Sequence, residues 1–160
     1  MNQKSLLLQF WNHEAVATRK VIARIPQEKS EYRPDPKSRT AREIAWLMVL
    51  EERLLVEGLE GGALDWRDDP VPVTVEEILR IYDAGHDEII SRLEHLDEGE
   101  WEKEIGLVVA GQELRRAAGY ELAWEVLFDQ VHHRGQLSTY LRPMGATVPS
   151  IYGPSADEGF

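Results

Sequence analysis

Asp129 and His133 are the two side chains whose types and spacing most clearly favour chemistry. They lie four residues apart in a segment whose apolar residues recur every three or four positions. Both therefore fall on the helix face that is expected to be buried. A carboxylate and an imidazole one turn apart can hold one metal ion together. The segment thus predicts part of a metal site on an inward-facing helical surface.

Three other helical segments each place an ionisable residue among apolar ones. These residues are Glu14, Glu51 and His86. A buried charge is costly unless it is paired or bound to a metal, so their convergence indicates a polar site inside the fold. A shell of histidine and carboxylate without sulfur suits Zn, Ni, Mn or Fe(II) and leaves positions open for water or substrate. We therefore take Asp129, His133, Glu51 and His86 as the candidate ligands of one divalent ion.

Each candidate also has a purely structural interpretation. The two histidines can hydrogen-bond within the core, and the aspartate can pair with Arg134 or with its histidine neighbour. Glu14 can pair with Arg19 or Lys20 further along its own helix. A small rotation of its helix would place Glu51 in solvent beside Glu52. The sequence alone leaves these alternatives open.

Four segments with helical periodicity must position these side chains, and strand-like alternation is nearly absent. They cover residues 4–25, 40–57, 74–96 and a stretch from about 113 or 117 to 142. Thr40-Ala-Arg-Glu43 and Thr74-Val-Glu-Glu77 have the spacing of capping boxes at the starts of the second and third helices. The pattern predicts an all-α fold, a four-helix bundle.

The connections are expected to be irregular. Residues 63–73 predict a loop, and the longer connection between the third and fourth helices, 97–116, predicts an irregular crossover or a short hairpin. Residues 146–160 contain repeated proline and glycine and are expected to lie extended across the surface. A length of 160 residues predicts a single domain, 1–160.

The composition of the chain argues against several classes of function. The chain has 18 Lys and Arg against 29 Asp and Glu, a formal charge of −11, which argues against a nucleic-acid partner. With no cysteine it has no disulfide, thiolate metal site or cysteine nucleophile. The N-terminal residues show no signal peptide, and no apolar run reaches membrane-spanning length. We expect a soluble, cytoplasmic protein without a membrane partner.

Two stretches resemble a known family. FDQVHHRGQLSTYLRPMGATVPSIYGPSADE (128–158) is similar to the C-terminal signature of the DinB-like (YfiT-like) superfamily, and RPDPKSRTAREIAWLM (33–48) resembles the entry to its second helix. The resemblance implies an antiparallel four-helix bundle, often a homodimer. It also implies a metal site of three histidines, one on the second helix and two spaced four residues apart on the fourth.

This chain departs from that triad at two positions. His133, before Arg-Gly-Gln, matches the last family histidine, whereas Asp129 stands at the preceding one. The second-helix histidine corresponds to Leu47, which cannot bind metal. Either the chain binds no metal, or Glu51, one turn beyond on the same face, takes over. His86 could then contribute from the third helix.

The family includes metal-dependent thiol transferases and hydrolase-like proteins. The resemblance therefore implies an enzyme whose metal activates a small thiol or a water molecule, with Arg134, Gln136 and Tyr140 as candidate substrate-binding residues. The alternative is a non-catalytic dimeric bundle with a decayed metal site, serving as a binding or stress-associated module. The second helix distinguishes these two functions: Leu47 favours a decayed site, whereas an inward-facing Glu51 favours a rebuilt metal site.

Overall fold

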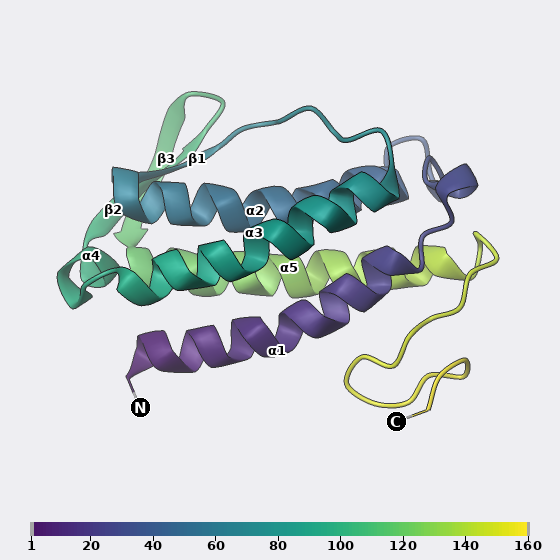
Figure 1. Cartoon of the computed structure of the whole chain (residues 1–160). Coiled ribbons are helices and arrows are strands. Elements are labelled where there is room, and N and C mark those ends of the chain that lie inside the picture. The colour runs from purple at the N-terminus through teal and green to yellow at the C-terminus, as the bar shows by residue number, and fades with distance from the viewer. Residues whose placement is uncertain (1, 160) are drawn as a thin grey trace.

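The computed structural model describes residues 2–159 of the chain. Most of this range is helical, and a small three-stranded sheet lies at one end (Figure 1). The helices are α1 (Gln3–Ala23), the 3-10 turn η1 (Gln27–Lys29), α2 (Ala41–Gly61), α3 (Val75–His95), α4 (Glu98–Glu102) and α5 (Gly119–Leu141). The strands are β1 (Ala63–Trp66), β2 (Glu104–Val109) and β3 (Gln112–Ala118).

The helix starts follow the capping signals in the sequence. The Thr40 hydroxyl accepts from the backbone N–H of Glu43 at 3.2 Å, and the Glu43 carboxylate accepts from the N–H of Thr40 at 2.7 Å. This is the complete capping box predicted for α2. At α3, Thr74 accepts from the N–H of Glu77, which is one of the two bonds of the predicted box. Gly62 ends α2 in the left-handed region, at φ 87°.

The four long helices lie side by side, and each packs against two others (Figure 1). Helix α2 contacts α3 and α5, and α1 contacts the same two helices. Helices α2 and α3 run in the same direction, opposite to α1 and α5. The simple antiparallel arrangement implied by the family resemblance is therefore wrong for the α2–α3 and α1–α5 pairs. The extended connection from α2 to α3 returns along the whole length of α2, which makes the parallel pair possible.

The sheet corrects the expectation of an all-α fold. Its order is β1-β2-β3, with β1 parallel to β2 and β2 antiparallel to β3. The hairpin alternative for the long connection holds: Ala110 and Gly111, at φ 50° and 76°, form its turn. Strand β1 lies inside the predicted loop 63–73. It has only four residues, too few for a clear alternation of apolar and polar positions.

Two apolar clusters form the core. One lies at the sheet end and includes Trp11, Leu55 and Trp101. The other lies toward the opposite end and includes Met48, Tyr82 and further buried residues of all four long helices. Between the two clusters, each of the four long helices carries buried or half-buried polar residues. The polar residues are Glu14, Glu51, Glu52, His86, Gln130, His133 and Arg134.

The tail after α5 has no helix or strand in its described part, which ends at residue 159. It returns toward α1 (Figure 1), where Glu158 forms ion pairs with Lys20 and Arg24. Over the described residues, none of the helices combines the length and apolar character needed to cross a membrane.

Candidate metal site

Glu51 of α2 meets Asp129 and His133 of α5 in the polar layer between the two apolar clusters. One potential ligand atom from each of the three residues lies within 4.8 Å of the others. The His133 Nε2 atom is 3.5 Å from an Asp129 carboxylate oxygen and 3.8 Å from a Glu51 oxygen. The helical spacing of the α5 pair and the packing of α2 against α5 together build this group.

The Glu51 carboxyl is the most unusual member of the group. It is fully buried, and in the part of the chain that the structure describes neither of its oxygens has a hydrogen-bond partner. Burial raises the pKa of the Glu51 carboxyl well above its ordinary value, and the nearby Asp129 raises it further. A buried carboxyl without a partner is strongly unfavourable. Its position is explained if something absent from the polypeptide satisfies both oxygens.

His133 is oriented by its own helix. Its Nδ1 atom lies 3.3 Å from the side-chain oxygen of Gln136, one turn further along α5. When Nδ1–H donates to that oxygen, the lone pair of Nε2 points to the two carboxylates. Metal-binding histidines are commonly oriented in this way by a second hydrogen bond. Gln130 fixes the spacing of the two helices, because its amide donates to the backbone oxygen of Met48 on α2 at 3.0 Å.

The donor set fits a divalent cation. Two carboxylates and one imidazole would surround the ion with two negative charges, and the orphaned oxygens of Glu51 would gain a partner. Three protein ligands also leave coordination positions open, as in catalytic rather than structural sites. Asp129 is the solvent-accessible member of the group, since 43% of its side chain is exposed, whereas Glu51 and His133 are buried.

A mostly apolar hollow leads to the exposed side of the group. It has a volume of about 360 Å³ and is bounded by β1, β2 and α5, and Asp129 is part of its wall. Its apolar lining consists of Leu64, Trp66, Leu107, Val109, Leu122 and Val126. The sheet, of which the sequence indicated only a possible hairpin in 97–116, therefore forms one wall of the space beside the candidate metal ligands.

The structure does not bring every sequence candidate to this group. His86 lies against Glu52, with its Nδ1 atom 3.1 Å from the carboxylate. Glu14 pairs with Arg134 at 2.6 Å, so its partner is on α5 and not on its own helix. Leu47, the position of the second-helix histidine in the family resemblance, is buried one turn before Glu51.

The three candidate substrate-binding residues make contacts within the fold. Arg134 is 1% exposed and also bonds the backbone oxygen of Glu14 and the hydroxyl of Tyr152. Tyr140 is buried, and its hydroxyl lies 3.4 Å from the backbone oxygen of Arg39. Gln136 is next to the group only through His133.

Sequence reasoning missed further polar residues in and around this layer, among them Gln130, Glu52 and Tyr152. Glu52 is 1% exposed and accepts from the indole N–H of Trp11 at 2.8 Å. Tyr152, in the tail, bonds both Glu14 and Arg134. The adjacency of Glu51 and Glu52 in an otherwise apolar stretch was the available signal for Glu52. Tyr152 has no periodicity to reveal it, because the tail is irregular.

Comparison with known proteins identifies a family and related sequences that match this chain. The model of the DinB family matches residues 1–159. The uncharacterized protein YrdA of Bacillus subtilis (strain 168) is 26% identical over 153 residues, which cover 94% of this chain and 89% of YrdA. The uncharacterized protein YjoA of the same organism is 24% identical over 148 residues, which cover 92% of this chain and 94% of YjoA.

Two solved structures share the fold. A DinB-like protein from Bacillus cereus ATCC 10987 matches with a TM-score of 0.75 and 22% identity, over 91% of this chain and 95% of that chain. The DinB-like protein YjoA from Bacillus subtilis matches with a TM-score of 0.71 and 19% identity, over 89% of this chain and 94% of its own. The likeness of fold thus covers about nine tenths of this chain and of each solved chain.

Proposed function

This chain belongs to the DinB family, and from that premise we propose that it is a metal-dependent enzyme with one divalent ion held by Glu51, Asp129 and His133. The observation that carries the proposal is the buried carboxyl of Glu51, whose two oxygens have no partner in the fold. Zn, Ni, Mn and Fe(II) all suit the donor set, and the two carboxylates shift the preference toward the harder ions Mn and Fe(II) relative to a set of three histidines.

The chemistry that we propose is the activation of a small thiol or a water molecule. A divalent ion supplies Lewis acidity, which lowers the pKa of a water or thiol that reaches it. The half-exposed Asp129 marks the side from which such a molecule can approach. Glu51 and His133, both buried, hold their positions because α2 and α5 pack against each other around them.

The apolar hollow beside Asp129 suits the second reactant. Its lining offers no positive charge, so it favours an uncharged group with an apolar body over an anion. In thiol transfer, the sulfur forms a bond to an electrophilic carbon of that reactant, the leaving group departs with the bonding electron pair, and the thiol proton passes to water. In hydrolysis, a water oxygen takes the place of the sulfur.

The proposal is tested with metal-loaded protein and two probe reactions. Conjugation of cysteine to chlorodinitrobenzene measures thiol transfer, and cleavage of nitrophenyl acetate measures hydrolysis. We expect one of them to proceed above background in wild type and to fall to background in Glu51→Gln and His133→Ala. His132→Ala is the matched control, because His132 is exposed and lies outside the group. Metal uptake without either reaction would contradict the proposed chemistry but not the metal site. Absence of metal uptake would overturn the whole proposal and favour the non-catalytic bundle with a decayed metal site.

A further inference from the structure

A second pocket, which has mostly apolar walls and a few polar atoms, lies on the other side of α2, between α2 and α3. It is a cavity of about 130 Å³ with apolar walls that include Trp46, Leu50, Ile81 and Ile89. Glu51 turns toward α5, but the next residue, Glu52, turns toward α1 and α3 and reaches this cavity. The cavity is therefore separate from the Glu51–Asp129–His133 group, and none of those three residues lines it.

His86 is held rigidly at the wall of this cavity. Its Nδ1 atom lies 3.1 and 3.2 Å from the two oxygens of Glu52, which also accepts from Trp11. The imidazole ring stacks on Tyr82, with ring centroids 5.5 Å apart and planes at 25°. The other ring nitrogen, Nε2, is buried and has no hydrogen-bond partner in the fold. The protein thus fixes this ring from two sides and leaves one polar atom unused.

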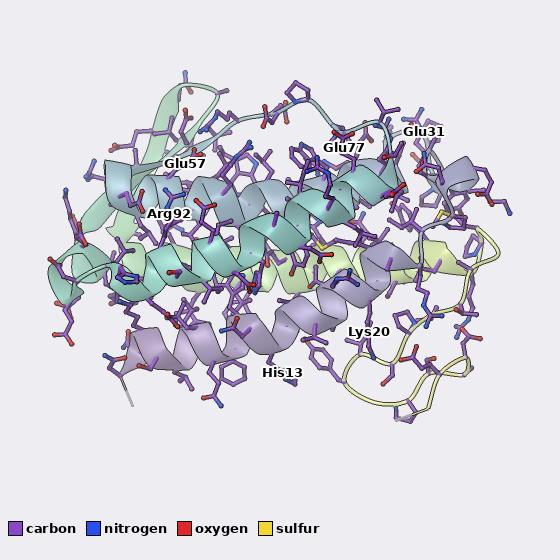
Figure 2. The ribbon with its side chains drawn as sticks, in the orientation of Figure 1. His13, Lys20, Glu31, Glu57, Glu77 and Arg92 are labelled. Carbon is purple, nitrogen blue, oxygen red and sulfur yellow. The ribbon has the colours of Figure 1, made fainter. Side chains whose placement is uncertain are left out.

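Arg53 supplies a second unused nitrogen at the same cavity. Its terminal nitrogen pairs with Asp69, and the guanidinium lies over the Trp46 ring at 6.0 Å. Its Nε atom is buried and has no hydrogen-bond partner among the described residues, since the Glu57 carboxylate oxygen on the same helix lies 3.8 Å away, beyond hydrogen-bond distance. The neighbouring Arg92 differs, because its Nε and one of its terminal nitrogens donate to the Glu60 carboxylate, at 3.0 and 2.6 Å. Figure 2 shows Arg92 between α2 and α3, near Glu57.

We propose that the cavity between α2 and α3 binds a small organic carboxylate with an apolar body, whose oxygens accept from Arg53 Nε and His86 Nε2. The Arg53 Nε–H can only donate, and because His86 Nδ1 faces the Glu52 carboxylate, His86 Nε2 donates when the ring is protonated. The ligand must therefore bring acceptor oxygens, and the apolar walls select the rest of it. Burial lowers the pKa of His86, but the hydrogen bond and charge of Glu52 outweigh burial and raise it, which favours a donating Nε2.

The test uses benzoate as the probe and benzamide as its uncharged counterpart, with binding to the full-length protein measured by saturation-transfer NMR. We expect benzoate to bind wild type at millimolar concentration and benzamide to bind more weakly. Two variants remove one donor each. Arg53→Met removes the guanidinium, and His86→Asn keeps an amide at the Nδ1 position for Glu52 while removing Nε2. Each should weaken benzoate binding by about tenfold, the loss expected for one charged hydrogen bond.

Two matched variants control for indirect effects. His95→Asn changes an exposed histidine on the same helix, and Arg19→Met changes an exposed arginine paired with Asp83 on another face. Both should bind benzoate as wild type does. Failure of wild type to bind benzoate, or equal binding by Arg53→Met and wild type, would overturn the proposal. Because Arg53 lies at the protein surface, its variant is expected to fold normally. This inference is independent of the proposed metal, so either can fail alone.

Discussion

Glu14 and Glu51 are both buried glutamates in the same polar layer, but their surroundings are opposite. Glu14 accepts from Arg134 at 2.6 Å and from the Tyr152 hydroxyl at 2.8 Å. Within residues 2–159, Glu51 has no hydrogen-bond partner for either oxygen, and Asp129, close to it on α5, is also acidic. Three segments of the chain, α1, α5 and the tail, close the first site. Only α2 and α5 form the second.

This contrast teaches how to separate a structural cluster from a ligand site. The Glu14 carboxylate is paired within the protein with the Arg134 guanidinium and the Tyr152 hydroxyl, so the cluster holds the tail against the helices without a bound ion. The Glu51 site brings two carboxyl groups and an imidazole together without a cation. Burying the Glu51 carboxyl without a partner destabilises the metal-free protein, and a bound ion would offset this free-energy cost. The following predictions test that difference, from the largest expected effect to the smallest.

Replacement of Glu14 by methionine should destabilise the protein by about 3 kcal/mol, because Arg134 would remain buried without its carboxylate. Urea unfolding measures the change. The exposed Arg19–Asp83 pair provides the control, and Asp83→Asn should cost less than about 1 kcal/mol. An equally small effect for Glu14→Met would mean that this cluster is not a structural ion pair.

The same replacement at Glu51 should have the opposite sign. Methionine removes a buried carboxyl that has no partner, so Glu51→Met should stabilise the metal-free protein by about 1 to 3 kcal/mol. It should also abolish metal uptake. Urea unfolding in the presence of a chelator measures the first effect, and elemental analysis measures the second. Destabilisation comparable to that of Glu14→Met would show that Glu51 has a structural partner.

The raised pKa of Glu51 predicts a pH dependence in the metal-free protein. Above the ordinary glutamate pKa, the unfolded chain releases this proton while the folded chain keeps it. Stability therefore falls with rising pH until the folded pKa is passed, by at most about 1.4 kcal/mol per pH unit. The difference between wild type and Glu51→Gln isolates this contribution, since Asp129, His133, Glu52 and Arg39 are common to both. A difference that does not change between pH 4 and pH 7 would contradict it.

The smallest effect is expected at the tail. Tyr152→Phe removes the hydroxyl that bonds Glu14 and Arg134 but keeps the ring, which lies 5.1 Å from the Arg134 guanidinium. We expect a loss of about 1 kcal/mol and faster proteolysis after α5, with no change in metal uptake. A change in metal uptake would show that the two sites are coupled.

The sequence predicted the helices well and the sheet poorly. Capping signals at Thr40 and Thr74 located two helix starts, because they depend on local hydrogen bonds. Strand β1 and its parallel partner β2 are about forty residues apart in sequence, and their pairing depends on tertiary contacts that no local pattern records. The direction of α3 relative to α2 likewise follows from the path of the connection, not from the periodicity of either helix.

For the candidate site, periodicity identified the right faces but not the right partners. It placed Glu51, Asp129 and His133 inward, and the structure brings them together. It also placed His86 inward, but His86 contacts Glu52 and not Glu51, the residue before it on α2. A helix face is broad enough to hold both glutamates, so a single sequence could not assign them.

The central claim is that Glu51, Asp129 and His133 hold a divalent ion. Elemental analysis of protein purified without a histidine tag tests this claim most directly. We predict about one divalent ion per chain in wild type and in His132→Ala, and its loss in Glu51→Gln and His133→Ala. Wild-type protein that contains no metal, and whose melting temperature does not rise with added Zn, Ni, Mn or Fe(II), would contradict the account.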